Sequence, residues 1–346
     1  MDKILAKKDF PHWLKKLESY RIYAPREKND VWNYEIITDP SGLALADVAV
    51  VVPVKKIVFP QREPFFEFRE DEEKGIAVTE LLPEDRPTVV FGVRPCEARA
   101  LTLMDKVFSG EFEDPYFRKR RNATTLVGLA CAEPPSPNCF CLSMGGSPKS
   151  KEGLDVLLTN LGDSYFAEAL TDKGKKLVAA GEKLFSAAKP GDKKKAEKIQ
   201  ADSEKKLPRK LEGIENIHLK LKDMFESPLW DQESMSCLRC GICTYLCPTC
   251  HCFDISDEVD QVSPLSGKRV RTWDTCQFPD FTMHSSGHNP RPEKLSRLRQ
   301  RINHKFQYFV ELWQTSQCTG CGRCISLCPV GIDIINVVEK VRDYGS

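Results

Sequence analysis

Two identically spaced runs of four cysteines lie near the C-terminus of this chain. Each run reads C-x2-C-x2-C-x3-C followed by proline; the first holds Cys237, Cys240, Cys243 and Cys247, and the second holds Cys318, Cys321, Cys324 and Cys328. Such a loop presents three thiolates to one [4Fe-4S] cubane, while the fourth thiolate serves the neighbouring cluster. We therefore predict that Cys237, Cys240, Cys243 and Cys328 hold one cubane, and that Cys318, Cys321, Cys324 and Cys247 hold another.

Zinc is the competing metal for cysteine-rich loops, but it normally takes two C-x2-C pairs separated by a long spacer. Neither run has that form, and two identical runs of the cubane type are a far more specific signal than one. Because cubanes exchange single electrons, the two runs indicate electron transfer.

Four further cysteines fall in the N-terminal half. Cys96 follows a strand predicted over 88–91, Cys131 ends a strand predicted over 125–129, and Cys139 and Cys141 lie in the next loop. If the two strands are parallel neighbours, their carboxyl ends meet at one edge of the sheet, and the four thiols converge there. We predict a third [4Fe-4S] cluster on Cys96, Cys131, Cys139 and Cys141. A zinc site and buried structural thiols are the alternatives.

Three more cysteines, Cys250, Cys252 and Cys276, stand outside these sets. We expect them to pack beside a cluster, where thiols can donate weak hydrogen bonds to its sulfides and shape its potential. The alternative is a metal site in which His251, with His284 or His288, completes the ligands.

Alternating apolar patterns indicate the elements that carry the N-terminal cysteines. We predict a helix over 9–20, strands over 49–52, 88–91 and 125–129, and a helix over 97–108 between the last two strands. A hairpin over 156–159 and 164–167 follows, and Thr171 opens another helix. Strand, helix and strand in this order favour a small α/β unit.

The fold class is α+β: an N-terminal α/β domain at 1–187, a charged linker at 188–221, and a mainly helical, ferredoxin-like dicluster domain with a long insertion at 222–346. The linker prediction rests on the lysines of 188–213, which leave little to bury. The insertion contains a helix predicted over 293–314, with an apolar stripe that we expect to pack beside the second cluster. Its basic residues, Arg297, Arg299, Arg301 and Lys305, are expected on solvated faces, with partner docking as the alternative.

Composition limits the possible partners. The 51 Lys and Arg balance 50 Asp and Glu, which gives no support for nucleic acid. No secretory signal is recognisable and no apolar run approaches the ~18 residues of a membrane span, so we expect no membrane association. Since 15 cysteines without an export signal suit metal ligation, we expect the cytoplasm of an anaerobe. No nucleotide fingerprint is present, so the chain itself should not accept hydride.

Several motifs outside the cysteine runs carry a family resemblance. FGVRPCEARAL at 91–101, CFCLSMGG at 139–146 and CPTCHCF at 247–253 resemble the iron–sulfur β subunit of cytoplasmic sulfhydrogenases, and the corresponding iron–sulfur subunit of anaerobic sulfite reductase is similar. The resemblance implies a position between an NAD(P)H-binding flavoprotein and a terminal redox subunit of hydrogenase, sulfite reductase or heterodisulfide-reductase type.

The leading interpretation is therefore a non-catalytic electron-transfer subunit of an anaerobic oxidoreductase complex. One alternative is an oxidoreductase whose N-terminal domain itself binds a flavin or substrate. Another is a structural or oxygen-sensing protein that uses its clusters for folding or detection.

Overall fold

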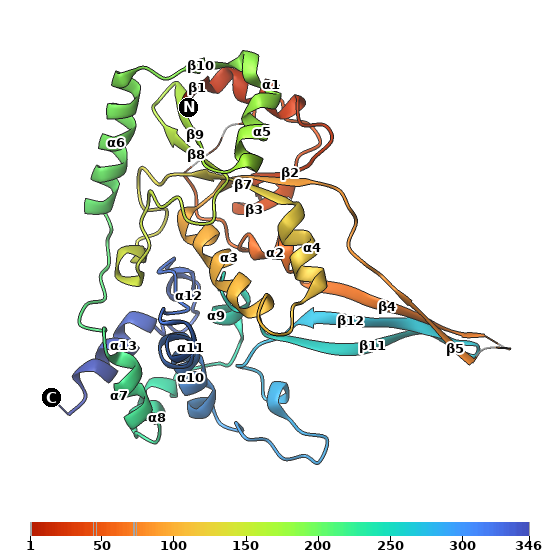
Figure 1. Cartoon of the computed structure of the whole chain (residues 1–346). Coiled ribbons are helices and arrows are strands. Elements are labelled where there is room, and N and C mark those ends of the chain that lie inside the picture. Colours follow the sequence, from red (N-terminus) through yellow and green to blue (C-terminus); the bar gives the residue numbers. More distant parts are fainter. Residues whose placement is uncertain (1, 44, 46, 72, 74, 346) are drawn as a thin grey trace.

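The computed structural model describes residues 2–43, 45, 47–71, 73 and 75–345. Within these residues the chain is mixed α/β, with two separate β-sheets and helices distributed along the sequence. Figure 1 shows the larger sheet in the upper part of the molecule, the helices of the C-terminal part below it, and the smaller sheet as an arm that projects to one side.

The larger sheet has eight strands in the order β10-β1-β9-β8-β7-β6-β2-β3 among the residues described. Its centre is parallel, since β2 pairs with β6, β6 with β7, and β7 with β8 in the same direction. The outer pairs are antiparallel. The bounds are β1 (Lys3–Ala6), β2 (Arg21–Lys28), β3 (Val31–Ile36), β6 (Thr88–Val93), β7 (Thr124–Leu129), β8 (Val156–Asn160), β9 (Ser164–Ala169) and β10 (Phe185–Ala187).

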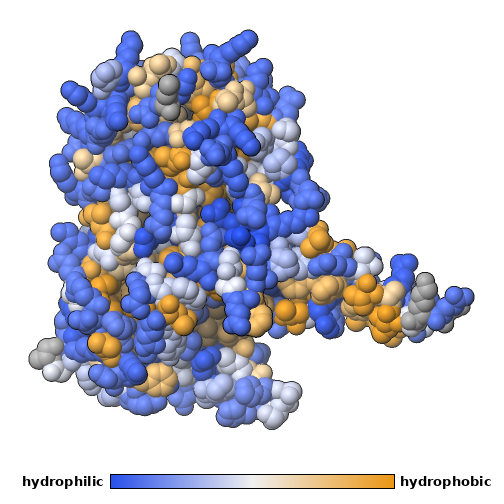
Figure 2. All heavy atoms as spheres, in the orientation of Figure 1, coloured by the Kyte–Doolittle hydropathy of each residue, from blue (hydrophilic) through white to orange (hydrophobic). Residues whose placement is uncertain are grey.

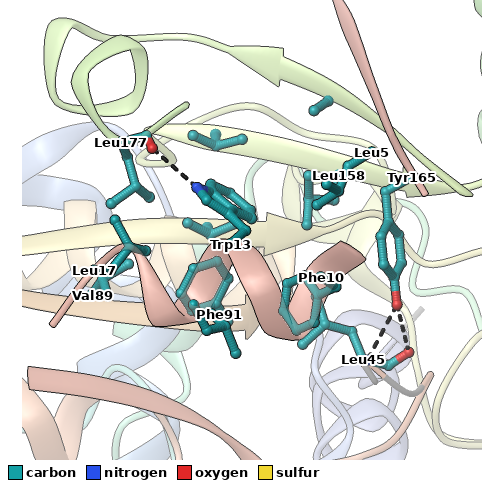
Figure 3. Close-up of a cluster of buried hydrophobic side chains, with 14 of the residues drawn as sticks. Leu5, Phe10, Trp13, Leu17, Leu45, Val89, Phe91, Leu158, Tyr165 and Leu177 are labelled. Atoms are coloured by element: carbon teal, nitrogen blue, oxygen red, sulfur yellow. Dashed lines mark hydrogen bonds between the residues drawn. The ribbon is translucent and has the colours of Figure 1, made fainter. Parts of the chain in front are cut away.

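Helices cover both faces of this sheet, as a buried parallel sheet requires. Side chains of α1 (Phe10–Lys15) and α5 (Asp172–Ala180) share one core with alternate residues of β6 and β7, such as Val89 and Val127. The opposite face packs against α2 (Lys55–Val58), α3 (Pro95–Phe108) and α4 (Pro115–Ala123), through Val90 and Leu126. Figure 3 shows Trp13 and Phe10 of α1 in the first of these cores.

Most of the predicted N-terminal elements are confirmed. They include β6, α3 and β7, the hairpin of β8 and β9, and α5, whose cap Thr171 accepts a hydrogen bond from the N–H of Gly174. The opening helix is shorter than predicted, since α1 ends at Lys15.

The strand predicted over 49–52 is wrong, because these residues form bends without a strand ladder. The carbonyl of Val50 instead accepts a hydrogen bond from Nε of Arg323 at 2.8 Å. Of this run only Val50 is buried, and Ala49, Val50 and Val51 line a cavity instead of pairing in the sheet. The sequence patterns did not predict β2, which pairs with β6 on this side, or β3, which pairs with β2 at the edge of the sheet.

The segment 188–221, expected to be a solvated and partly helical linker, contains the long helix α6 (Pro190–Lys205). One face of α6 is buried: Ala196 packs with Leu161 and Phe166 of the sheet, and Nε2 of Gln200 donates to Thr159 at 2.7 Å. Thirteen of its sixteen residues are nevertheless at least partly exposed, which explains why composition alone suggests a linker.

The C-terminal part is mainly helical apart from one hairpin. Its helices are α7 (Ile217–Asp223), α8 (Leu229–Ser234), α9 (Ile242–Tyr245), α10 (Lys294–Asn303), α11 (Phe309–Trp313), α12 (Arg323–Ser326) and α13 (Ile334–Asp343). A π-helical turn at His304–Tyr308 joins α10 to α11, so the predicted insertion helix is confirmed with a widened turn in its middle. None of the helices described is long and apolar enough to cross a membrane.

The smaller sheet joins the two halves of the chain. Its order is β11-β12-β4-β5, all antiparallel, with β4 (Arg62–Asp71) and β5 (Gly75–Glu80) from the N-terminal half and β11 (Phe253–Val262) and β12 (Leu265–Trp273) from the insertion. Figure 2 shows apolar side chains along the projecting arm. The two predicted domains are thus linked by a shared sheet.

A buried arginine anchors the arm to the body. Arg271 of β12 is 1% exposed, and its guanidinium pairs with Glu63 at 2.5 Å and with Asp114 at the start of α4. The same guanidinium lies over the rings of Phe59 and Phe65, at 4.9 and 4.8 Å from their centroids. Charge pairing and ring contacts together offset the cost of burying this cation.

Trp13 is the largest fully buried side chain of the upper core, so its truncation tests the fold. Its ring lies within 5.2 Å of Phe91 and 5.0 Å of Phe185 between centroids, and Nε1 donates to the carbonyl of Leu177 at 3.1 Å. We expect Trp13→Ala to lower the free energy of unfolding by about 3–5 kcal/mol, measured by anaerobic denaturant titration. Phe112→Ala, at a side chain that is 86% exposed, is the control and should leave the titration midpoint unchanged. Equal midpoints for both variants would contradict this account of the core.

Candidate iron–sulfur centres

The structure brings together the four residues predicted to hold the second cubane. Cys318, Cys321 and Cys324 line one cavity, and Cys247 of the first run lines the same cavity from the opposite loop. Gly322 lies between the loop cysteines at a φ of +75°, a conformation that glycine adopts without strain. Cysteines from both runs therefore meet at one site, which is the arrangement that the cross-ligation prediction requires.

The first run has the same local backbone. Gly241 has a φ of +76° and opens α9, just as Gly322 opens α12. The sulfurs of two predicted ligands accept backbone hydrogen bonds, Cys237 from the N–H of Arg239 at 3.4 Å and Cys328 from the N–H of Ile332 at 3.2 Å. Cys240 is the exposed member of this set. The assignment of Cys328 to Cys237, Cys240 and Cys243 stays a prediction.

The four N-terminal cysteines meet at a third site. Because β6 and β7 are parallel neighbours, Cys96 and Cys131 leave the same edge of the sheet. Together with Cys139 and Cys141 they line a cavity of about 280 Å³. Cys321, a predicted ligand of the second cubane, lines this cavity as well.

The size of this cavity fits a cluster better than one metal ion. Four thiolates about 2.3 Å from a zinc ion would close around it, whereas the space here far exceeds what one water molecule needs. Burial raises the pKa of Cys139 to about 11 and of Cys141 to about 12, so these thiols need a bound metal to ionise at neutral pH.

The loops of the second and third sites touch directly. The N–H of Phe140 donates to the carbonyl of Gly320 at 2.9 Å. A Cβ at Gly320, whose φ is +67°, would lie 2.6 Å from the backbone of Phe140, so only glycine permits this approach. The second site therefore lies against the loop that carries Cys139 and Cys141.

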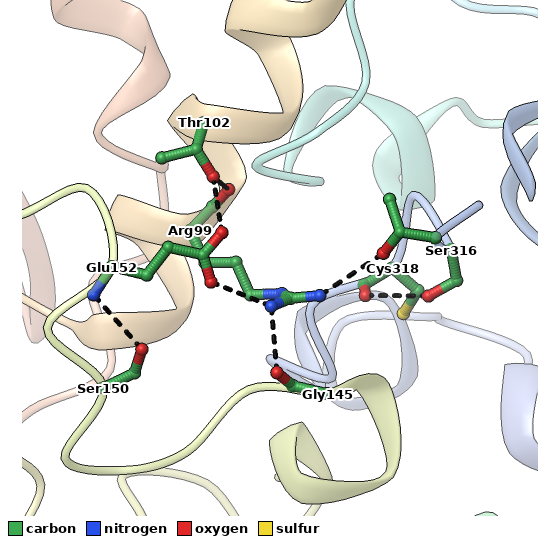
Figure 4. A network of polar contacts seen from close by, with 8 residues as sticks. Arg99, Thr102, Gly145, Ser150, Glu152, Ser316 and Cys318 are labelled. Carbon is green, nitrogen blue, oxygen red and sulfur yellow. Dashed lines mark hydrogen bonds and ion pairs between the residues drawn. The ribbon is translucent and has the colours of Figure 1, made fainter. Parts of the chain in front are cut away.

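Arg99 of α3 fixes the same junction from one side. Its guanidinium donates to the carbonyl of Gly145 at 2.9 Å, pairs with Glu152 at 2.8 Å, and reaches Oγ1 of Thr315 at 3.4 Å (Figure 4). One side chain thus connects the helix after Cys96, the loop after Cys141 and the residues before Cys318.

A buried ion pair joins the other side. Oε1 of Glu97, next to Cys96, accepts from Nη2 of Arg323 at 2.8 Å and from the N–H of Val54 at 3.1 Å, while Oε2 accepts from Oη of Tyr34 at 2.5 Å. Glu97 is fully buried. Burial, followed by the charge of Glu97, raises the pKa of Tyr34, which keeps the phenol protonated as a donor.

The basic residues of the insertion helix are not on solvated faces, so that prediction is wrong. Arg297, Arg301 and Lys305 are 0%, 5% and 2% exposed, and Arg299 is half-buried against the ring of Phe225. Arg301 and Lys305 line the second site. Burial opposes their charge, but nearby thiolates raise the pKa of both, chiefly Cys243 for Arg301 and Cys247 for Lys305. These cations face inward because the sites they line are anionic. The apolar stripe of the same helix does pack beside Cys318 and Cys324, as predicted.

The remaining thiols also gather at one place. Cys250, Cys252 and Cys276 line a small cavity with His251, and the second imidazole there belongs to His304. His284 and His288 instead pack on each other in an exposed loop, with ring centroids 5.3 Å apart. Neither of them lines the cavity of Cys250, Cys252 and Cys276, so the alternative of a metal site completed by His251 stays untested.

Comparison with known proteins places this geometry in a family. Residues 236–332 match the family of 4Fe-4S dicluster domains. Over 337 residues the chain is 30% identical to "Sulfhydrogenase 2 subunit beta" of Pyrococcus furiosus, covering 96% of each protein. The chain belongs to the sulfhydrogenase β-subunit family. The resemblance noted in the sequence is thereby confirmed, and the dicluster domain indicates two [4Fe-4S] clusters in this β-subunit relative.

The buried cation of Lys305 gives the first prediction for the second cluster. A reduced cluster carries one more negative charge, so removing the cation should disfavour reduction. We expect Lys305→Met to make reduction of the second cluster less favourable by about 1–2 kcal/mol, which lowers its one-electron reduction potential by ~40–90 mV. The potential is measured in a redox titration followed by electron paramagnetic resonance. Lys294→Met removes an exposed charge from the same helix and should shift the potential far less. Equal shifts in the two variants would show that the burial of Lys305 is irrelevant.

The buried Glu97–Arg323 pair gives a second prediction. Arg323→Met leaves the Glu97 carboxylate buried without its cation, which should cost about 3–5 kcal/mol of unfolding free energy in anaerobic denaturant titration. Adding Glu97→Gln to Arg323→Met should restore part of that loss, because the uncompensated charge disappears. Lys175→Met breaks a surface pair with Asp172 and serves as the control. A double variant less stable than Arg323→Met would overturn the electrostatic explanation.

Proposed function

We propose that this chain is a non-catalytic electron-transfer subunit of a multi-subunit anaerobic redox complex. The observation that carries the proposal is the contact between the sites: Cys321 lines both the second and the third cavity, and the loops of the two sites share a backbone hydrogen bond. Sites in direct contact suit the relay of single electrons, whereas a structural metal site needs no neighbour.

The ligand sets follow from this arrangement. The first cubane takes Cys237, Cys240, Cys243 and Cys328, and the second takes Cys318, Cys321, Cys324 and Cys247. A third takes Cys96, Cys131, Cys139 and Cys141. When bound, such clusters supply one-electron oxidation and reduction at potentials set by burial, hydrogen bonds and nearby charge.

The order of the sites suggests a path through the chain. The third site adjoins the second through Cys321, and Arg301, whose Nη2 donates to the carbonyl of Cys243 at 3.2 Å, lies between the second site and the first run. The first run reaches the surface at Cys240, where Leu238 is 61% exposed and Met235 is 74% exposed. This surface is suited to the docking of a redox partner.

The proposed partner subunits are those that the resemblance to sulfhydrogenase β subunits implies. A flavoprotein that binds NAD(P)H stands at one end of the relay, and a terminal redox subunit of hydrogenase, sulfite reductase or heterodisulfide-reductase type stands at the other. The cytoplasm is the proposed location, with no membrane or nucleic acid among the partners.

The alternative of an enzyme with its own flavin or substrate has one supporting feature. A cleft of about 720 Å³ lies at the amino ends of β6 and β7, with Arg21, Arg86 and Arg120 on its walls. Two of these cations are already paired, Arg21 with Glu84 and Arg120 with Glu63. The relay therefore explains more of the structure.

The electron donors that the purified full-length chain accepts distinguish a relay subunit from an enzyme. We expect the reconstituted, flavin-free protein to be bleached by a strong chemical reductant but to oxidise neither NADH nor NADPH at a useful rate. Turnover of either pyridine nucleotide by this sample, or release of a flavin when the protein as purified, before reconstitution, is denatured, would refute the relay proposal in favour of the enzyme.

The iron content tests the third cluster. We expect about twelve irons per full-length chain after anaerobic reconstitution, and about eight in Cys96→Ser or Cys141→Ser, measured by iron analysis and absorbance. Ser147→Ala changes the wall of the same cavity without removing a thiol and should retain about twelve. Eight irons in the wild-type chain would show that the third site holds no cluster. Eight irons together with bound zinc would show that the third site binds zinc and not a cluster.

A further inference from the structure

Two of the thiols outside the predicted ligand sets lie against each other at the base of the arm. Phe253 of β11 pairs with Trp273 of β12, and beyond this pair the N–H of Asp274 donates to the carbonyl of Cys252 at 3.0 Å. The chain then bends back, so that Cys276 returns to Cys252. Both side chains line the same small cavity, and the neighbouring Cys276 thiol, followed by burial, raises the pKa of Cys252.

The surroundings favour a thiolate at Cys276. Nε2 of Gln277 donates to the Cys276 sulfur at 3.4 Å and is itself held by the carbonyl of Arg297 at 3.0 Å. The contact with Cys252 lowers the pKa of Cys276 to about 6, and Gln277, Arg301 and Lys305 act in the same direction. A thiolate beside a thiol is the arrangement from which disulfide chemistry begins.

The third thiol of this cavity is engaged elsewhere. The sulfur of Cys250 contacts Cys247, a proposed ligand of the second cubane. Lys55, which is 2% exposed, donates to the carbonyl of Cys250 at 2.6 Å and fixes that backbone. In the part of the chain that the structure describes, Cys252, Cys276 and their neighbours form no group suited to a single metal ion. Cys252 and Cys276 thus lie outside the ligand sets proposed for the three clusters.

We infer that Cys252 and Cys276 form a reversible disulfide that exchanges electrons with the clusters of this chain. In the oxidising direction the S–H bond of Cys252 breaks, and one S–S bond forms with the Cys276 thiolate. Two electrons leave singly, one to each of two oxidised cubanes, and one proton leaves to solvent past the half-buried Cys252 and His304. In the reducing direction the same atoms and electrons return.

This inference rests on the proposed relay, since the clusters supply and accept the electrons. The cavity of the pair shares Arg301 and Lys305 with the second site, which places the dithiol next to it. Protein disulfides and protein-bound cubanes have overlapping ranges of reduction potential, so exchange in both directions is chemically reasonable. The dithiol would thus store two electrons at one place, next to clusters that each carry only one.

Thiol trapping on the cluster-loaded, full-length protein tests the inference. One sample is poised with dithionite and another with ferricyanide; both are quenched in acid, alkylated and digested for peptide mass spectrometry. We expect Cys252 and Cys276 to be alkylated in the reduced sample and cross-linked to each other in the oxidised one. Cys252→Ser and Cys276→Ser should lose the cross-link and take up about two electrons fewer per chain in a coulometric titration. Cys250→Ser is the matched control and should retain the cross-link.

Two outcomes would overturn the inference while leaving the relay intact. One is full alkylation of both thiols in the oxidised sample although the clusters are reducible by electron paramagnetic resonance. The other is a loss of about four irons, or of bound zinc, from Cys276→Ser, because a metal ligand is not free to form a disulfide. Clusters that accept no electron from dithionite would instead contradict the proposed function and this inference together.

Discussion

The carboxylate of Glu97 is the point on which the arrangement of the sites depends. It adjoins Cys96 at the start of α3, and its ion pair with Arg323 reaches the loop of the second site. The same two oxygens hold Tyr34 of β3 and the backbone of Val54. A buried carboxylate destabilises the folded state unless its ion-pair and hydrogen-bond partners are all in place. The pair therefore couples the folding of the sheet edge to the position of the cysteine loop, and holds the two sites in contact.

Local patterns predicted the parts of the molecule that depend on neighbours close in sequence. Apolar runs located β6 and β7, helical spacing located α3 and the insertion helix, and the parallel order of the two strands brought Cys96 and Cys131 to one edge. The cysteine spacing also predicted that Cys247 reaches the second site. The elements follow from short stretches of chain, whereas the meeting of Cys96 with Cys131 follows from the parallel pairing of β6 and β7, and that of Cys247 with the second run from the repeated cysteine spacing.

The features that escaped prediction depend on partners far away or absent from the residue pattern. The strands of the arm are rich in charge, and apolar and polar residues do not alternate regularly along them. β4 pairs with β12, which lies far away in the sequence. Arg301 and Lys305 occupy positions that would be solvated in an ordinary amphipathic helix. Here the compensating anions are thiolates from other loops, so only the assembled site explains their burial.

The shared sheet also constrains how this protein is made. During synthesis β5 is complete at Glu80, whereas β12 begins only at Leu265. At about 5–20 residues per second, roughly 10–40 s pass before β12 can pair with the open edge of β4 in the nascent β4–β5 hairpin. Unpaired edges of this kind invite wrong pairing on a crowded ribosome. We therefore expect expression of this chain to depend strongly on chaperones and on translation speed. If its two halves were encoded as separate genes, each half would first fold with an incomplete sheet.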